Sequence, residues 1–340
     1  MTAYQQLRKE LAAQSCTWLI TGVAGFIGSH LLEELLRLDQ RVIGLDDLSS
    51  GTVKNLQMVK ENVSTSQWER FAWHEGDVTN FDICRQLSER VDYVFHQAGF
   101  VSVPQSIENP LACHSVNVTG TLNLFVAARE NRVRRVVYAS SSAVYGDEIS
   151  MPLVESKIGQ PLSPYGASKL MDEIYARQFS HVLGLETVGL RYFNVFGSRQ
   201  NPFGGYAAVI PQWINAMLAG QPCTINGDGS ITRDFCHVAD VVQANLLAAT
   251  ALGKNVVGEV FNVGLGGSTT LKEIHTLIAR QITALGLKAE PAKFGPTRLG
   301  DILHSSADIS KSRAQLGYTP QSTVEQGLAE TVRWYQAANF

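Results

Sequence analysis

The stretch TGVAGFIG at residues 21–28 decides the fold of this chain. It follows an apolar run at residues 16–20 and opens an amphipathic segment at 26–40. Glycines between a strand and a helix permit a tight turn and let backbone N–H groups approach a pyrophosphate at the helix N-terminus. Glycine-rich turns also end strands that bind nothing, so the flanking strand and helix patterns matter. In this context the GxxGxxG spacing predicts a dinucleotide-binding unit.

The second apolar run supports this prediction and selects the dinucleotide. Asp46 ends the run at residues 41–46, about 20 residues after the glycines, where an acid accepts hydrogen bonds from the adenosine ribose hydroxyls. Its charge would repel the extra phosphate of NADP, and Asp47 follows without an adjacent Arg or Lys. We therefore predict NAD as the cofactor. Asp77 ends a further run and is expected near the adenine amino group, with an ordinary strand-end cap as the alternative.

The remaining pattern predicts an α/β fold. Apolar, β-branched runs at 16–22, 41–47, 71–78, 91–98, 134–142 and 186–197 alternate with helical periodicity, as at 119–132. Such alternation is typical of a parallel sheet covered on both faces. We predict a Rossmann doubly wound parallel sheet with a smaller α/β C-terminal substrate-binding lobe. The NAD-binding domain is expected at 1–195, with 234–265 returning to it, and the lobe at 196–233 and 266–340.

Composition excludes several classes of protein. The 340 residues carry a formal net charge of −3, which offers no strong field to recruit nucleic acid or an acidic membrane surface. We see no run of about 18 apolar residues and no signal peptide. The five cysteines are odd in number and form no CxxC pair, which favours reduced thiols in the cytoplasm and no metal site. They are Cys16, Cys84, Cys113, Cys223 and Cys236.

A second group of polar residues indicates a catalytic site. Three serines, 140–142, end an apolar run, and Tyr165 and Lys169 open a helical segment about 20 residues later. Tyrosine and lysine at positions i and i+4 share one helix face. The ammonium would stabilise a phenolate that takes a proton from a substrate hydroxyl as hydride leaves for NAD, and a serine can share that proton. A surface helix pair is the alternative, and the preceding glycine motif favours catalysis.

Six motifs together carry a resemblance to a known family. They are TGVAGFIG at 21–28, SSSAVYGD at 140–147, SPYGASK at 163–169, RYFNVFG at 191–197, RDFCHVAD at 233–240 and RLGDILHSSADISK at 298–311. In this order the chain resembles the extended short-chain dehydrogenase/reductase superfamily of nucleotide-sugar enzymes. Within it, the chain is most similar to the UDP-N-acetylglucosamine 4-epimerase group, which is UDP-glucose 4-epimerase-like. The resemblance makes the C-terminal lobe a nucleotide-sugar-binding lobe.

The resemblance implies roles for individual residues. Tyr165 would be the acid/base, Lys169 its electrostatic partner, Ser141 the catalytic serine and Ser142 a helper. The predicted cofactor site also comprises Gly22, Gly25, Phe26, Ile27, Gly28, Asp46, Asp47, Ser50, Gly51, Asp77, Val78, Gln97, Ala98, Asn117, Tyr192 and Val195. The diphosphate is assigned to Asn194, Arg233 and Arg298, because arginine bonds phosphate bidentately. The uridine and ribose are assigned to Val209, Thr224, Asn226 and Asp301, and the sugar to Ser102, Gln200, Ala208 and Ser305.

The resemblance also indicates which reaction the chain catalyses. Related dehydratases carry an acid beside the catalytic serine, whereas this chain reads Ser141-Ser142-Ala143-Val144. We therefore expect C4 epimerisation through a transient 4-keto sugar. Family members restricted to unsubstituted hexoses carry Tyr at the position of Ser305, so Ser305 favours UDP-N-acetylglucosamine and UDP-N-acetylgalactosamine. Val101 stands where that group has glycine, so a UDP-N-acetylhexosaminuronic acid or UDP-glucose stays an alternative.

Other hypotheses stay open at this stage. A dehydratase or decarboxylase is disfavoured, and a non-catalytic NAD-binding protein would not need the serine, Tyr165 and Lys169 together. An NADP-linked carbonyl reductase is opposed by Asp46 and Asp47. The resemblance also implies a homodimer through the segment 120–132 and the helix that carries Tyr165, although apolar faces there can simply cover the sheet.

Overall fold

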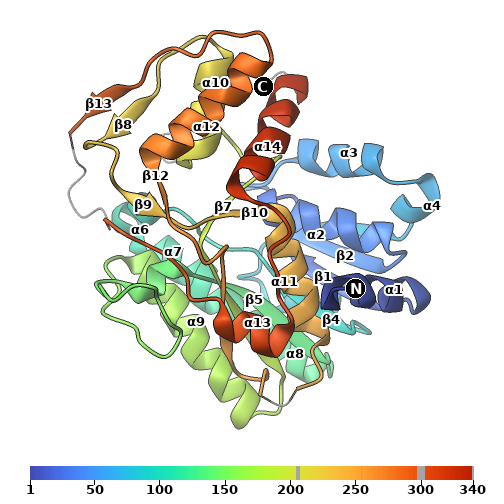
Figure 1. Ribbon diagram of the computed structural model, residues 1–340. Helices are drawn as coiled ribbons and strands as arrows, with labels where there is room; N and C mark the ends of the chain where they lie inside the picture. Colours follow the sequence, from blue (N-terminus) through green and yellow to red (C-terminus); the bar gives the residue numbers. More distant parts are fainter. Residues whose placement is uncertain (204–206, 254, 297–302, 339–340) are drawn as a thin grey trace.

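The computed structural model describes residues 1–203, 207–253, 255–296 and 303–338. Among these residues, seven parallel strands form the central sheet in the order β11–β6–β5–β4–β1–β2–β3 (Figure 1). The chain runs outward from β1 to β3, returns to place β4 beside β1, and then continues in the other direction. This is the doubly wound arrangement with a switch point between β1 and β4, so the predicted fold class is confirmed. The strands are β1 (Thr17–Thr21), β2 (Arg41–Asp46), β3 (Phe71–Glu75), β4 (Tyr93–His96), β5 (Arg135–Ser141), β6 (Thr187–Tyr192) and β11 (Val260–Val263).

The central strands are mostly apolar because helices cover both of their faces. Trp18, Leu19 and Ile20 of β1 are fully buried, and every residue of β6 is buried. The Trp18 ring stacks on Tyr93, and its indole N–H donates to Oε1 of Gln40 at 3.1 Å. The large polar-tipped side chain is therefore satisfied inside the core.

Two groups of helices cover the sheet, each with its own hydrophobic cluster. One face carries α2 and α11, with α1 packed on α11, and the other carries α5, α8 and α9. The helices of this half are α1 (Ala3–Ala13), α2 (Phe26–Arg37), α3 (Val53–Asn62), α4 (Thr65–Trp68), α5 (Phe81–Leu87), α6 (Val103–Glu108), α7 (Pro110–His114), the π-helical turn η1 (Ser115–Thr119), α8 (Gly120–Glu130), the 3₁₀ turn η2 (Ser142–Tyr145), α9 (Pro164–His181), α11 (Val238–Thr250) and α13 (Ser310–Leu316).

A third hydrophobic cluster builds the smaller C-terminal lobe (top of Figure 1). It lies among α10, α12 and α14, and its centre includes Ile214, Ile278 and Leu328, which are fully buried. The elements of this half are β7 (Asn194–Phe196), α10 (Val209–Leu218), β8 (Thr224–Asn226), β9 (Thr232–Arg233), β10 (Phe235–His237), β12 (Thr269–Thr270), α12 (Leu271–Ala284), β13 (Lys293–Gly295) and α14 (Val324–Ala338). The residue boundaries predicted for the two halves stay a prediction.

The structure corrects one predicted strand. The run 186–197 forms two strands, because the chain leaves the sheet after Tyr192 and β7 pairs instead with β10. The backbone N–H of Asn194 donates to the carbonyl of Asp234 at 3.0 Å and starts this second pairing. The break turns Asn194 and Val195 away from the sheet and toward the lobe side of the molecule.

A buried ion pair joins the lobe segment to the sheet half. Arg199 donates from Nη1 to Oε2 of Glu33 on α2 at 2.6 Å, and both side chains are largely buried. Arg199 also donates to Nδ1 of His30, whose Nε2 bonds the carbonyl of Ser198. Removing one partner of such a pair leaves a buried charge, so this contact fixes how the chain crosses over α2.

One helical run has the length and apolar composition that a membrane span would need. Within the described residues this run is Pro110–Glu130, and half of its most apolar window is buried in the fold. Polar residues such as Asn117 and Thr119 interrupt its apolar ones, so it contains no continuous apolar run of that length.

The glycine turn yields a first prediction. A Cβ at Gly28 would lie 2.0 Å from the carbonyl oxygen of Gly22, and neither backbone can move without shifting β1 or α2. We expect Gly28→Ala to lower the free energy of unfolding by about 3 kcal/mol, measured by urea denaturation. Gly267→Ala is the control, because a Cβ there meets no atom within 4 Å. Equal denaturation midpoints for the two variants would contradict the prediction.

Candidate active site

The glycine turn forms a cradle of backbone N–H groups. Gly22 has φ +70°, a conformation that favours glycine, and an added Cβ would lie 2.7 Å from the backbone nitrogen of Ala98. Gly25 caps α2 without a side-chain hydrogen bond, whereas the side chains of Thr52 and Ser163 cap α3 and α9. The first N–H groups of α2, from Phe26 to Gly28, therefore face outward at a positive helix end. This cradle fits a pyrophosphate.

The acid predicted to bind the ribose lies beside this cradle. Asp46 ends β2 and accepts hydrogen bonds from the backbone N–H groups of Ala24 and Leu48, both at 2.9 Å. Burial raises the pKa of Asp46, and these hydrogen bonds oppose the rise. Each carboxylate oxygen keeps a further lone pair for a ribose hydroxyl. Gly51 leaves the necessary space, since a Cβ there would lie 2.9 Å from both Asp46 oxygens.

Of the neighbouring predicted residues, some shape the adjacent loops and others can contact the cofactor. Asp47 is exposed and accepts from the backbone and hydroxyl of Ser49, so it shapes the loop that carries the exposed Ser50. Asp77 accepts from the backbone N–H of Thr79 at 2.8 Å, which is the strand-end cap that the sequence left as an alternative. A carboxylate that caps a turn still has a second oxygen for an adenine amino group. Val78 is buried beside it.

A buried histidine connects the cradle to the opposite helix layer. Burial lowers the pKa of His96 to about 3, so its ring is neutral. The Thr21 hydroxyl accepts from the backbone N–H of Ala98 and forms a hydrogen bond with Nδ1 of His96 at 2.7 Å. Nε2 of His96 forms a hydrogen bond with the Thr121 hydroxyl at 2.9 Å. This chain fixes the ends of β1 and β4, between which a dinucleotide lies in doubly wound folds.

Amide side chains line the far end of the predicted cofactor site. Gln97 donates to Asn245 at 3.1 Å, and the Tyr192 hydroxyl bonds both of these amides, so Tyr192 is held inside the fold. Asn117 lies in the π-helical turn η1, a feature frequent at functional sites, and is fully buried. Val195 is partly buried on β7.

The catalytic candidates meet where β5 ends and α9 begins. Ser141 accepts from the backbone N–H of Ala143 at 3.1 Å, which turns the chain into η2 and holds Ser142 at the same bend. Gly166 lets α9 approach this bend, because a Cβ there would lie 2.7 Å from the carbonyl oxygen of Ala143. The first turn of α9 also carries Tyr165, so the structure brings the two serines and the tyrosine together.

The lysine of the pair points toward the cofactor side. A Cβ at Gly99 would lie 3.2 Å from Oδ1 of Asn117 and 3.5 Å from Nζ of Lys169, so these groups gather around the end of β4. Lys169 is nearly buried. An ammonium in this position can hydrogen-bond a ribose and stabilise a phenolate one helical turn away.

A buried acid, Glu173, holds α9 against the end of β5, which carries the serines. The Ser140 hydroxyl donates to Oε1 of Glu173 at 2.5 Å, and Arg191 of β6 donates to both oxygens of Glu173, at 2.8 and 2.7 Å. Burial alone lowers the pKa of Arg191, but the hydrogen bonds and charge of Glu173 raise it above its ordinary value. The bidentate pair therefore fixes α9 against β5 and β6.

The predicted substrate residues lie mostly on the lobe side. Asn194 bonds the Asp234 carbonyl, and Arg233 bonds the Thr232 carbonyl. The backbone N–H of Ser305 donates to Thr232, which places Ser305 beside Arg233. Ala208 caps α10, Val209 begins it, and Thr224 and Asn226 pair with β13. Ser102 is the N-cap of α6, and its side chain accepts from the backbone N–H of Gln105. Arg298 and Asp301 lie outside the described residues.

Gln200 belongs to the crossing segment between the halves. Its Nε2 donates to the carbonyl of Val195 at 3.2 Å, and its Oε1 is buried without a hydrogen-bond partner. A buried amide oxygen that lacks a donor fits a role in binding a polar ligand group. Among the described residues, no group of three or more His, Cys, Asp or Glu could hold a metal ion.

Sequence reasoning missed several residues that hold this site. Ser106 accepts from the backbone N–H of Tyr165 at 3.1 Å, and Asp234 accepts from three backbone N–H groups, those of Leu265, Gly266 and Ala307. Asn245 contacts Gln97 from 148 positions away, so no local pattern could reveal it. Asp172 and Glu173 lie three and four residues after Lys169, a helical spacing that the sequence shows.

The doubly wound sheet and the glycine turn define a Rossmann-type enzyme that binds a dinucleotide. The chain belongs to the NAD dependent epimerase/dehydratase family, which matches residues 18–264. It is 39% identical over 320 residues to a UDP-glucose 4-epimerase of Mycolicibacterium smegmatis, covering 94% of this chain and 98% of that one. It is also 32% identical to a UDP-glucuronate 4-epimerase of Thermodesulfobacterium geofontis, covering 93% and 95%.

A solved structure is similar over the same length. It is a UDP-N-acetylglucosamine 4-epimerase from Methanobrevibacter ruminantium M1 in complex with UDP-N-acetylmuramic acid. The TM-score is 0.87 at 37% identity, covering 96% of this chain and 99% of that one. The protein is accordingly a UDP-sugar 4-epimerase, an isomerase that uses NAD.

The buried acid of α9 yields a second prediction. Glu173→Gln leaves the Arg191 guanidinium buried without its counter-charge, so we expect a loss of about 3–5 kcal/mol in unfolding free energy. Chemical denaturation followed by circular dichroism measures it. The control is Asp82→Asn, which removes an ion pair with Arg85 whose side chains are 81% and 55% exposed and which should cost about 0.5 kcal/mol or less. A loss for Glu173→Gln no larger than that of the control would contradict the prediction.

Proposed function

We propose that the protein interconverts UDP-N-acetylglucosamine and UDP-N-acetylgalactosamine by inverting C4. Tyr165 takes the proton of the C4 hydroxyl as the acid/base, and Ser141, assisted by Ser142, shares that proton. NAD, which the glycine turn and Asp46 would hold, would supply the hydride acceptor and donor for inversion through a 4-keto sugar. Lys169 supplies the positive charge that stabilises the phenolate during proton transfer.

The observation that carries the sugar preference is the small, buried side chain of Ser305. Its backbone bond to Thr232 and the bridge between Leu153 and Ala307 fix this segment beside Arg233. A serine there leaves space for an N-acetyl group that the tyrosine of hexose-restricted relatives would fill. None of the predicted sugar residues, Ser102, Gln200, Ala208 and Ser305, carries a charge, which favours a neutral C6 group over a uronic acid.

Elimination chemistry finds no support in the site. A dehydratase needs an acid beside the catalytic serine, and the residues that follow Ser141 are Ser142, Ala143 and Val144. The buried acids of α9 already bind cations, since Asp172 pairs with Lys169 and Glu173 with Arg191. Five free cysteines, four of them buried, support placing this epimerase in the reducing cytoplasm, where UDP-sugars for polysaccharide synthesis are interconverted.

The test incubates the purified protein separately with UDP-GlcNAc, UDP-Glc, UDP-GlcNAcA and UDP-GlcA, and follows the anomeric protons by NMR. We expect C4 inversion of UDP-GlcNAc to be fastest. Ser305→Tyr should reduce that rate more than the rate with UDP-Glc. Tyr165→Phe should lower kcat about 10²- to 10⁴-fold while NAD still binds. A faster uronic acid, or a 4-keto-6-deoxy product, would contradict the proposed substrate or reaction.

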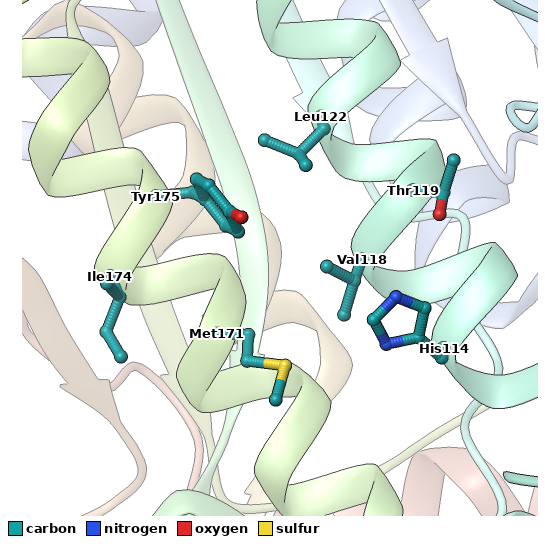
Figure 2. Close-up of a pocket in the computed structure, with 7 residues that line it drawn as sticks. All are labelled: His114, Val118, Thr119, Leu122, Met171, Ile174 and Tyr175. Carbon is teal, nitrogen blue, oxygen red and sulfur yellow. The ribbon is translucent and has the colours of Figure 1, made fainter.

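We also propose that the protein is a homodimer formed by α9 and the run from α7 to α8. Figure 2 shows side chains of these two neighbouring helices gathered around a surface hollow. Ile174 is 55% exposed and Met171 42% exposed, although both are apolar. A second copy of the chain would bury this face and form a four-helix bundle. The lining residues are His114, Val118, Thr119, Leu122, Met171, Ile174 and Tyr175.

We expect Ile174→Glu to convert the dimer to a monomer in size-exclusion chromatography with light scattering, because a charge would be buried in the interface. Ile149→Glu is the matched control, since Ile149 is 88% exposed on the loop between β5 and α9. The control should stay dimeric. A monomeric wild-type protein, or two variants of equal mass to the wild type, would contradict the dimer.

A further inference from the structure

Lys169 has a buried partner outside the predicted site. Its Nζ lies 3.3 Å from Oδ2 of Asp172, and the two side chains are only 5% and 2% exposed. The residues are three positions apart on α9, so one helical turn holds both groups. Asp172 belongs to neither the predicted cofactor set nor the predicted substrate set. The pair therefore needs an explanation of its own.

The surroundings of Asp172 supply little else to hold its charge. Its second oxygen, Oδ1, is buried without a hydrogen-bond partner. Burial raises the pKa of Asp172 to about 6, and Lys169 and then the Thr121 hydroxyl oppose the rise. The charged or titratable groups that face it are Lys169 and Glu173 on α9, His96 on β4 through Lys169, Tyr138 on β5 and Cys113 on α7. His96 is neutral, and Glu173 is committed to Arg191.

Burying the ammonium of Lys169 costs free energy, and Asp172 offsets this cost. An ammonium removed from water loses its proton readily unless an opposite charge lies within a few ångströms. Asp172 supplies that charge. Because it lies one turn further along α9 than Lys169, the ion pair also holds Nζ in the region near Asn117 and Gly99. Tyr165 lies two turns away, a rise of about 10 Å, so the charge of Asp172 acts far more strongly on Lys169 than on the tyrosine.

We propose that Asp172 is a positioning residue that keeps the Lys169 ammonium charged and in place for proton transfer at Tyr165. The inference rests on the catalytic roles proposed above and adds a residue to them. Without Asp172, the buried ammonium loses its counter-charge and gives up its proton at lower pH. The phenolate of Tyr165 then loses its stabilising charge, and activity declines at a pH at which the wild-type enzyme is still active.

The first test is the pH profile of kcat for the holoenzyme. We expect Asp172→Asn, which preserves side-chain shape, to move the alkaline limb down by about one pH unit or more. Asp172→Glu restores the carboxylate and should move the limb back toward the wild type. Asp240→Asn is the matched control, because Asp240 is also fully buried with a pKa raised to about 6 by burial. Asp240 lies on α11 and accepts from the backbone N–H of Gln321, so it is not a partner of Lys169 in the described contacts. The control should leave the limb unchanged.

The second test reads Lys169 directly and does not depend on turnover. In protein labelled with ¹⁵N-lysine, the Nζ signal of Lys169 is assigned by its loss in Lys169→Arg. In the wild type we expect this signal to shift near pH 6, as Asp172 gains a proton and the ion pair is lost. In Asp172→Asn that shift should vanish, and the ammonium should deprotonate at lower pH than in the wild type.

The outcomes separate the two proposals. A merely structural role for Asp172 would lower the melting temperature or kcat without moving the alkaline limb or the Nζ titration. Unchanged titrations in both measurements would therefore overturn the inference while leaving the epimerase mechanism intact. Full activity in Tyr165→Phe would instead overturn the catalytic assignment on which the inference rests. If Asp172→Asn does not fold, the wild-type Nζ titration near pH 6 decides the matter by itself.

Discussion

The ion pair between Arg191 and Glu173 is the interaction on which the site depends. It joins β6 to α9, and through the Ser140 hydroxyl it also holds the end of β5. Both side chains are buried, so neither charge can be left without the other except at a cost of several kcal/mol. The serine strand and the tyrosine helix are consequently held at one spacing, which an acid/base pair requires because a misplacement of 1 Å costs much of its rate.

Contacts of Arg191 also connect the site to the proposed substrate-binding lobe. Its guanidinium lies 4.8 Å from the centre of the Tyr145 ring, and the Tyr145 hydroxyl donates to Asn262 of β11 at 2.7 Å. Asn262 in turn donates to the carbonyls of Leu153 and Asp308, which flank the segment carrying Ser305. A continuous set of buried polar contacts therefore runs from the catalytic helix to the residue that carries the proposed sugar preference. Networks of this kind rigidify a site because each unsatisfied member would be costly.

The cofactor side depends on close backbone approach instead of charge. Gly28 lets α2 approach the end of β1, and Gly22 lets that end approach the backbone after β4, at distances that no Cβ would permit. The N-terminal end of α2 carries a partial positive charge. Asp46 and the neutral His96 complete this side without adding a cation. The ammonium of Lys169, paired with Asp172, lies near Gly99 after the end of β4, close to the predicted cofactor site.

The sequence by itself determined the sheet, the glycine turn and the preference for NAD, because these features repeat local patterns of spacing and polarity. It also predicts the tyrosine–lysine–serine set. The helical periodicity predicted at 119–132 also matches α8, which spans Gly120–Glu130. Only the tertiary structure decided that the run 186–197 breaks into β6 and β7, and that Asn245, Asp234 and Arg191 hold the site. These contacts join residues far apart in the chain, and a buried polar group is satisfied by whichever partner the packing brings near it, which no local pattern records.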